Sequence, residues 1–171
     1  MSNVNILRAS PEHIGAIYEI TKRAFSIYKD NLHADAYLGA LTETEADIAA
    51  DIKDNAVFVA EKNQKILGCV RISALSKDVA YLYRFAVDDA ERNNGVGAEL
   101  LRAVIDYCNQ HNFALIALHT NAKYYKLARY YYGMNFYVHS TDNSRGYIRA
   151  LFIKELSEAA ESADLECAFK K

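Results

Sequence analysis

Gly95 and Gly97 stand one residue apart, shortly after Arg92, in the stretch AERNNGVGAELL. Apolar residues at helical spacing begin immediately afterwards, so the two glycines occupy a turn that leads into a helix. The first turn of a helix presents unpaired N–H groups and the positive end of the helix dipole, and glycine lets a ligand approach that backbone closely. The pattern therefore predicts a site for a phosphate or pyrophosphate group, to which Arg92 adds a positive charge.

Two familiar phosphate-binding patterns do not fit this turn. A Walker loop needs lysine and then serine or threonine after its last glycine, and a dinucleotide loop needs a third glycine. Here Gly97 is followed by Ala98 and Glu99 instead. A P-loop nucleotide binder is therefore a weak alternative, and the plain alternative is a helix entry whose glycines serve packing alone.

The elements around the turn alternate between helices and strands. Val79–Val87 is rich in aromatic and branched residues without clean alternation, which is typical of a central strand buried on both faces. An early hairpin and a late pair of strands favour a mixed sheet over a fully parallel one. The expected helices cover Ser10–Tyr28, Glu43–Lys53, Val96–Cys108 and Lys123–Met134. The other expected strands cover Ala56–Glu61, Ile66–Ala74, Phe113–Thr120, Phe136–Val138 and Tyr147–Ile153.

Composition and charge exclude several classes of protein. The chain has 171 residues, 51% of them hydrophobic and 25% charged, with a net charge of −2, which indicates one globular domain without a nucleic-acid footprint. No leader pattern and no run of about 18 to 20 apolar residues are present, so we expect a cytoplasmic protein without a membrane span. Cys69, Cys108 and Cys167 are widely spaced, which favours buried thiols over a disulfide framework or a metal site.

Several stretches resemble the GCN5-related N-acetyltransferase (GNAT) family. FAVDDAERNNGVGAELLRAVIDYC resembles its motif A, in which the fourth strand leads through R/Q-x-x-G-x-G/A into the third helix, and LARYYYGMNF resembles the A-x-x-L-Y-x-x-x-G-F ending of its fourth helix. ILRASPEH and ALFIKEL are similar to its first and last strands. Asn93 and Asn135 stand where the family often has glycine, but asparagine tolerates a left-handed backbone. Tyr124 replaces an asparagine that often faces the cofactor.

The resemblance covers about residues 4–156 and implies the GNAT fold. This is an α/β fold with a mixed, mostly antiparallel central sheet, helices on both sides, and a splay between strands four and five. Residues 1–156 would form the acetyltransferase domain. Residues 157–171 would form a tail with a short amphipathic helix through Ala159, Ala160 and Ala163, which either covers a groove or extends freely.

The resemblance also implies acetyl-CoA as cosubstrate, without a metal. The pantetheine arm would pair with the backbone at Val87, and the N–H of Phe85 would donate to the thioester carbonyl as an oxyanion donor. The backbone N–H groups that would hold the pyrophosphate belong to Arg92, Asn93, Asn94, Gly95, Val96, Gly97 and Ala98.

Tyr131 aligns with the tyrosine that protonates the leaving thiolate in the family. The alternative is a core tyrosine, because it shares a helix face with other apolar residues; Tyr130 and Tyr132 are expected to point elsewhere. Tyr81 occupies the strand position where some relatives carry a glutamate base, and Tyr83 lies on the same face, but tyrosine is a poor base near neutral pH. His119 is a candidate base, and a water chain ending on hydroxyls and carbonyls is the preferred route.

The expected function is transfer of the acetyl group to a primary amine by direct attack in a ternary complex. The acceptor, a small molecule or a peptide, cannot be identified from the sequence, and neither nucleic acid nor a membrane is expected as a partner. A homodimer is an open alternative to a monomer. The functional alternative is a noncatalytic acyl-CoA-binding sensor that retains the loop.

Overall fold

The computed structural model describes residues 4–32 and 36–169, except for the side chain of Cys167. Every helix and strand expected up to Ile153 is present, with ends that differ by a few residues. The strands are β1 (Asn5–Arg8), β2 (Ala56–Lys62), β3 (Lys65–Ala74), β4 (Val79–Val87), β5 (Leu115–Asn121), β6 (Tyr137–Asp142) and β7 (Arg149–Glu155). The helices are α1 (Ile14–Lys29), α2 (Glu45–Asp54), α3 (Val96–Gln110), α4 (Tyr125–Gly133) and α5 (Leu165–Ala168).

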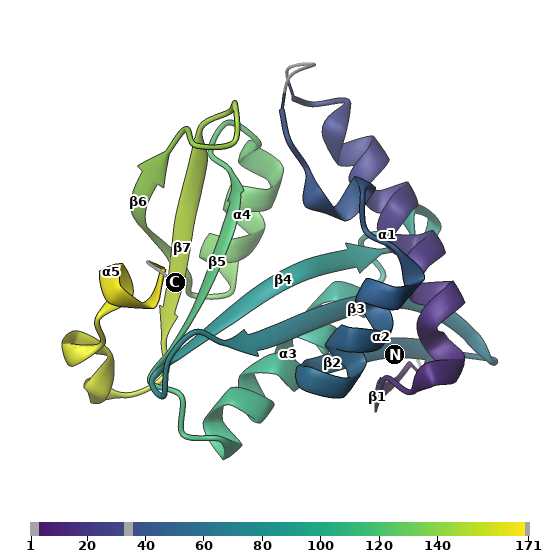
Figure 1. The fold of residues 1–171 in the computed structure, drawn as a ribbon, viewed down its shortest axis with the longest axis horizontal. Helices are drawn as coiled ribbons and strands as arrows, with labels where there is room; N and C mark the ends of the chain where they lie inside the picture. Colours follow the sequence, from purple (N-terminus) through teal and green to yellow (C-terminus); the bar gives the residue numbers. More distant parts are fainter. Residues whose placement is uncertain (1–3, 33–35, 170–171) are drawn as a thin grey trace.

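The strands form one sheet in the order β1-β2-β3-β4-β5-β7-β6, in which only β4 and β5 run parallel. β4 therefore lies at the centre, as predicted from its composition. Its pairing with β5 ends at Tyr81 and Ala117, although both strands continue further. Figure 1 shows the two strands diverging from a common end. The mixed sheet and its splay between β4 and β5 confirm the expected fold class.

Helices cover both faces of the sheet (Figure 1). On one face, Ile17 and Ile20 of α1 and Ile48 of α2 pack against Val57 and Val59 of β2. On the other face, α3 and α4 share a larger core with the inner strands. Among the described residues, no helix has the length and apolar character that crossing a membrane requires.

Local sequence signals set the helix starts. Ser10 and Pro11 begin a short 3-10 turn that runs into α1, and Thr44 caps α2 through a bond from the Asp47 N–H. Asn135, in the turn after α4, has a φ of 60°, which is the left-handed backbone expected of it.

The C-terminal tail contains short helical segments, of which the one expected through Ala159, Ala160 and Ala163 ends at Ser162. It forms a 3-10 segment (Glu158–Ser162) and the short helix α5. Ala160, Leu165 and Ala168 are buried in a cluster with residues of β4, β5 and β7. Tertiary packing of small apolar residues therefore holds the tail, which covers the sheet and does not extend freely.

A buried ionic network ties α2 and the segment before it to the sheet. Arg71, in the middle of β3, is completely buried, and its guanidinium donates bonds of 2.8 Å to both carboxylate oxygens of Glu43 and a bond of 2.7 Å to Asp51. Arg84 of β4 also donates to Glu43, at 2.9 Å, and the Tyr83 hydroxyl donates to Asp51 at 2.8 Å. Burial alone would lower the pKa of Arg71, but the bonds and charge of Glu43 raise it.

We expect replacement of Arg71 by leucine to lower the free energy of unfolding by about 3 to 5 kcal/mol, because two carboxylates lose their buried cation. Urea denaturation measures this change. The control is Arg102→Leu on α3, which removes an exposed ion pair with Glu99 and should cost about 1 kcal/mol or less. Equal, small effects of the two substitutions would contradict a structural role for the network.

Candidate active site

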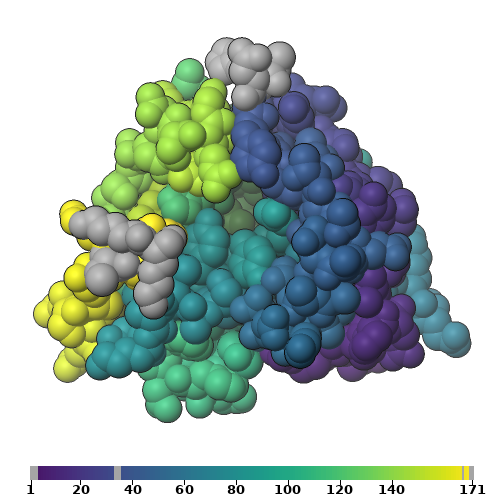
Figure 2. Space-filling view, viewed as in Figure 1, coloured from purple at the N-terminus to yellow at the C-terminus, as the bar shows by residue number. Residues whose placement is uncertain are grey.

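A cleft of about 900 Å³ opens where β4 and β5 part. Its walls come from the C-terminal part of α1, the segment before α2, β4, the start of α3, the end of β5, α4 and the loop between β6 and β7. Figure 2 shows the surface hollowed between that loop, in yellow-green, and the segment before α2, in blue. The cleft therefore joins elements from both halves of the sheet.

The glycine turn forms the start of α3 at one end of the cleft. Gly95 caps the helix with a φ of 84°, and Asn93 has a φ of 69°, so both adopt the left-handed backbone expected here. The first helical bond runs from the Glu99 N–H to the Gly95 carbonyl at 3.0 Å. The N–H groups of the preceding helical residues therefore have no acceptor within the helix and are available to a ligand.

Gly95 and Gly97 serve different purposes. A side chain at Gly95 would strain the backbone, whereas Gly97 lies in the helix and borders the cleft. A Cβ atom at Gly97 would lie 3.4 Å from the Tyr130 hydroxyl, 3.5 Å from the Phe85 ring and 3.7 Å from Val87, all ordinary contacts. A methyl group therefore fits there, and a larger side chain would extend into the cleft.

The side chains of most of the predicted residues line the cleft, and those of two do not, although the role predicted for these two concerns their backbone N–H groups. Val96 is buried in the core, and the Asn94 side chain bonds to Glu91, so neither side chain lines the cleft. The Arg92 guanidinium pairs with Asp89 at 2.9 Å, which partly offsets its charge. The predicted residues that line the cleft are Phe85, Val87, Arg92, Asn93, Gly95, Gly97, Ala98 and Tyr131.

A β-bulge reshapes β4 where it faces the cleft. Tyr83 pairs with Arg71 and Ala86 pairs with Cys69, so two residues of β4, Arg84 and Phe85, oppose one residue of β3. Arg84 has a φ of 51°, which is uncommon for a residue with a side chain. The bulge frees the backbone at Phe85 from regular pairing on both sides, because β5 has already diverged.

Tyr131 lies both in the core and at the cleft. It is 6% exposed and packs against Phe136 and Phe152 in the core, yet it also lines the cleft. Burial raises the pKa of its phenol well above the ordinary value. The hydroxyl therefore keeps its proton at neutral pH, as a general acid must.

The expectation that Tyr130 points away from the cleft was wrong, whereas Tyr132 is 53% exposed as expected. The Tyr130 hydroxyl is buried beside Gly97 and has no hydrogen-bond partner among the described residues. Burial raises its pKa to about 12. A buried donor without a partner is costly, so this hydroxyl fits an acceptor oxygen of a bound ligand. Neighbouring tyrosines in one helix gave no sequence signal to separate them.

His119 and Tyr81 meet at the other end of the cleft. The Tyr81 hydroxyl lies 3.0 Å from Nδ1 of His119, and Tyr81 stacks on Tyr83. Burial lowers the pKa of His119 to about 4, and the nearby charge of Arg149 acts in the same direction. Burial also raises the pKa of both tyrosines. At neutral pH this wall is therefore an uncharged set of hydrogen-bonding groups.

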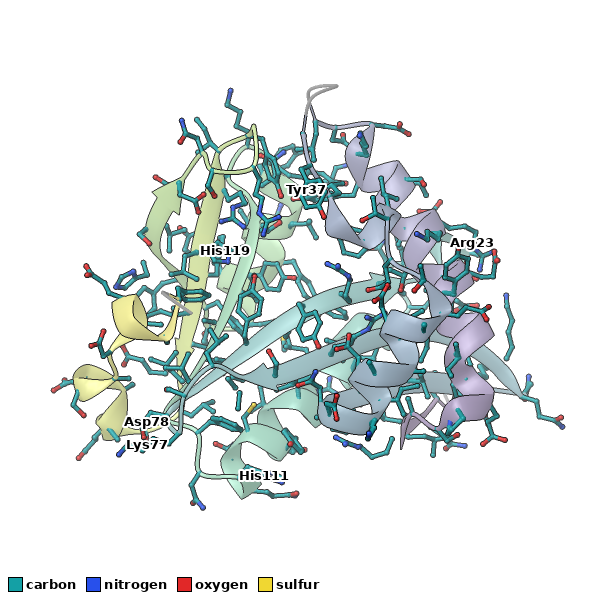
Figure 3. The ribbon with its side chains drawn as sticks, viewed as in Figure 1. Arg23, Tyr37, Lys77, Asp78, His111 and His119 are labelled. Atoms are coloured by element: carbon teal, nitrogen blue, oxygen red, sulfur yellow. The ribbon has the colours of Figure 1, made fainter. Side chains whose placement is uncertain are left out.

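The tail supports this wall from behind. The Phe169 ring packs edge-on against Tyr81 and His119, with centroids 5.6 and 5.3 Å away. Figure 3 shows His119 on β5 and Tyr37 on the segment before α2, on opposite sides of the cleft. No group of three or more metal-ligating side chains occurs within the part of the chain that the structure describes.

Three arginines at this end were not anticipated from the sequence. Arg84 comes from the bulge, and Arg145 and Arg149 come from the β6–β7 loop and the start of β7. Isolated arginines in a strand and a turn carry no spacing signal, and only the fold brings them together.

Comparisons with known proteins agree with this geometry. The family model described as the acetyltransferase (GNAT) family matches residues 15–136. A search among proteins of curated function returned no match. The structure is similar to three solved acetyltransferase structures, each under 25% identical in sequence.

The first is the PaiA N-acetyltransferase of Thermoplasma acidophilum in complex with coenzyme A, with a TM-score of 0.79, 16% identity, and coverage of 91% of this chain and 99% of that one. The second is YncA of Salmonella typhimurium with its cofactor acetyl-CoA, with a TM-score of 0.75, 19% identity, and coverage of 92% and 96%. The third is the ribosomal-protein-S18-alanine N-acetyltransferase of Escherichia coli, with a TM-score of 0.72, 20% identity, and coverage of 95% and 99%.

We expect Gly97→Val to weaken acetyl-CoA binding about tenfold or more, equivalent to about 1.4 kcal/mol, because the branched side chain extends into the cleft. Isothermal titration calorimetry measures the affinity. Gly97→Ala is the matched control: its methyl group fits and improves helix propensity, so both affinity and folding should be retained. Unchanged affinity in Gly97→Val would assign the glycine to packing alone.

The low pKa of His119 predicts a specific loss of stability in acid. The unfolded chain binds the histidine proton near pH 6.5, whereas the folded protein binds it only near pH 4. The folded state therefore loses stability as the pH falls through that window, by roughly 1 to 2 kcal/mol after allowance for partial exposure to solvent. Urea denaturation at pH 7 and pH 4 should show a smaller loss in His119→Gln. An identical loss in both proteins would contradict the lowered pKa.

Proposed function

This chain belongs to the GNAT family of acetyltransferases, and from that premise we propose which of its residues bind acetyl-CoA and carry out acetyl transfer to an amine. The protein is an acetyl-CoA-dependent N-acetyltransferase. The observation that carries the proposed site is the cleft that runs from the free N–H groups at the start of α3 to the tyrosine-rich wall around Tyr81.

The residues at the α3 end fit the pyrophosphate and pantetheine of acetyl-CoA. We propose that the backbone N–H groups of Asn93 and of residues 95–98 bind the pyrophosphate, with the helix dipole adding to the attraction. The N–H groups of Arg92 and Asn94 already donate to the carbonyls of Asp89 and Glu91, at 3.3 and 3.2 Å. Arg92 and Lys126 line this end and add positive charge. The unpartnered Tyr130 hydroxyl beside Gly97 supports the assignment, because it offers a donor at the place where the ligand would pass. Val87 would offer its backbone to the pantetheine arm.

The bulge in β4 supports the role proposed for Phe85. Its N–H would donate to the thioester oxygen, where negative charge develops during attack. Acetyl-CoA supplies the activated acetyl group as a thioester. The amine loses one proton and the sulfur gains one, so the products are an amide and a free thiol.

Tyr131 is proposed to give its proton to the departing sulfur. Its raised pKa keeps the phenol protonated before the transfer, and its ring is held by Phe136 and Phe152. For the amine proton we propose a water chain ending on hydroxyls and backbone carbonyls. His119 is a weak base with a pKa of about 4, and the protonated Tyr81 and Tyr83 do not accept a proton readily.

We further propose that residues 1–156 contain the whole catalytic domain, because none of the described residues of the tail lines the cleft. The tail would then act by supporting the wall formed by Tyr81 and His119. The cytoplasm is proposed as the compartment because Cys69 and Cys108 are buried free thiols, which suits a reducing environment.

Tyr131→Phe tests the catalytic role of the phenol. The substitution removes only the hydroxyl, so we expect acetyl-CoA affinity to stay near that of the wild type while kcat and kcat/KM fall together by about 10²- to 10⁴-fold. Thiol release with an accepted amine measures turnover, and calorimetry measures binding.

The exposed neighbour provides the control, because Tyr132→Phe makes the same chemical change outside the cleft and should leave turnover unchanged. Full activity in Tyr131→Phe would contradict the general-acid assignment. Binding of acetyl-CoA by the wild type without turnover of any amine would favour the noncatalytic sensor.

A further inference from the structure

Three guanidinium groups line the end of the cleft where the acceptor would enter. They belong to Arg84, Arg145 and Arg149. Among the described residues that line the cleft, the only carboxylate is that of Glu91, which lies beside the turn before α3, at the opposite end. The acceptor end is therefore lined by positive charge without a lining carboxylate to offset it.

Two of these arginines are held in place from outside the cleft. Arg84 is anchored by Glu43 at 2.9 Å, and Arg149 is anchored by Asp142, with bonds between 3.0 and 3.2 Å. Burial of Asp142 opposes ionisation, but the bonds from Ser144 and Arg149 lower its pKa to about 2, so this anchor stays charged. Neither anchoring carboxylate lines the cleft, and Asp142 also lies 3.7 Å from Nε2 of His119. Such support keeps guanidinium groups in a defined orientation toward a ligand.

Arg145 occupies the mouth of the cleft. Its guanidinium lies over the Tyr37 ring, 5.2 Å from the ring centre, and its carbonyl accepts a bond of 3.1 Å from the Tyr37 N–H. These contacts join the β6–β7 loop to the segment before α2. Neither of them uses an N–H group of the Arg145 guanidinium as a hydrogen-bond donor. Arg145 is therefore the arginine best placed to bind a group that enters the cleft.

The positive field reaches the groups deep in the cleft. Burial raises the pKa of Tyr81, and the charges of Arg149, Arg145 and Arg84 all act to lower it. The charge of Asp142 acts on the pKa of Tyr81 in the opposite direction, so three cations and one carboxylate influence this wall. A ligand that carried further positive charge would be repelled there, whereas an anion would be attracted.

We propose, on the basis of the function proposed above, that the acceptor is a small amine that also carries an anionic group, a carboxylate or a phosphate, bound by Arg145 together with Arg84 or Arg149. The planar guanidinium fork matches either anion. Polyamines and lysine-rich peptides are excluded as preferred acceptors, since their extra charges would meet the arginines.

The same charges also assist the reaction. An ammonium group beside arginines has a lowered pKa, because like charges disfavour the protonated form. The acceptor amine would therefore lose its proton to water more readily in this cleft, which has no lining carboxylate at this end to act as a base. The arginines would bind the anion of the acceptor and favour the neutral amine at once.

Matched pairs of amines test the proposal. Thiol release from acetyl-CoA is measured with L-tyrosine and tyramine, L-phenylalanine and phenethylamine, and phosphoethanolamine and ethanolamine, with spermidine as the polycationic probe. We expect the anionic member of at least one pair to exceed its partner tenfold or more in kcat/KM. The amino acid pairs report a carboxylate, and the phosphoethanolamine pair reports a phosphate.

Arg145→Gln should remove most of that preference by raising KM for the amine that carries the anionic group, while kcat/KM for the counterpart that lacks this group changes less than twofold. Arg145→Lys should restore part of the preference, because it retains the charge and loses the fork. Arg129→Gln on α4 is the matched control, since it removes one exposed arginine that does not line the cleft and should leave both substrates unaffected.

The outcomes separate this inference from the proposed function. Turnover of spermidine, or of the amines that lack an anionic group, at the same or higher kcat/KM would overturn the anionic acceptor and retain the acetyltransferase site. Equal losses for both members of a pair in Arg145→Gln would also overturn it. Absence of thiol release with every amine, together with acetyl-CoA binding, would instead count against the proposed catalytic residues.

Discussion

The parting of β4 and β5 is the constraint on which the rest of the structure depends. Beyond the pair formed by Tyr81 and Ala117, the backbone of β4 has no neighbouring strand on one side. Backbone N–H and C=O groups that lose a partner must find water or a ligand. The bulge at Arg84 then turns the freed segment, so that Phe85 faces Gly97 and Tyr130 while Arg84 reaches Glu43. An interruption of the sheet thus becomes a binding surface.

Such an opening needs support from both sides, and the molecule supplies it with polar contacts. On one side, the buried Arg71 network fixes α2 and the segment before it to β3 and β4. Across the opening, the Tyr28 hydroxyl of α1 accepts a 2.7 Å bond from the Asn121 N–H at the end of β5. The bond between Tyr37 and Arg145 spans the mouth. The two halves of the sheet therefore separate in the middle and are tied again at their far ends.

The sequence predicts what depends on local pattern. The bounds of β4 and the left-handed backbone at Asn93 follow from short stretches with specific composition or backbone requirements, whereas the place of Tyr131 follows from the resemblance of its helix to the family. Arg145 and Tyr130 could not be assigned to the cleft in this way, because their role comes from contacts between segments distant in the chain. The packing of the tail could not be predicted for the same reason: alanines at helical spacing suggested a short helix, but its burial against the sheet depends on contacts with distant strands.

The charges in the cleft suit a reaction in which a neutral amine attacks the thioester and a neutral thiol leaves. The groups closest to the acceptor end, His119 and Tyr81, are neutral at physiological pH because burial disfavours their charged forms. The charges are arginines, which do not titrate and therefore cannot serve as bases. A carboxylate in their place would stabilise an incoming ammonium ion and so hold back the nucleophile. Positive charge does the opposite, because it destabilises the ammonium form. The energetic cost of placing an amine beside the arginines is offset if the same substrate brings an anion for them to bind.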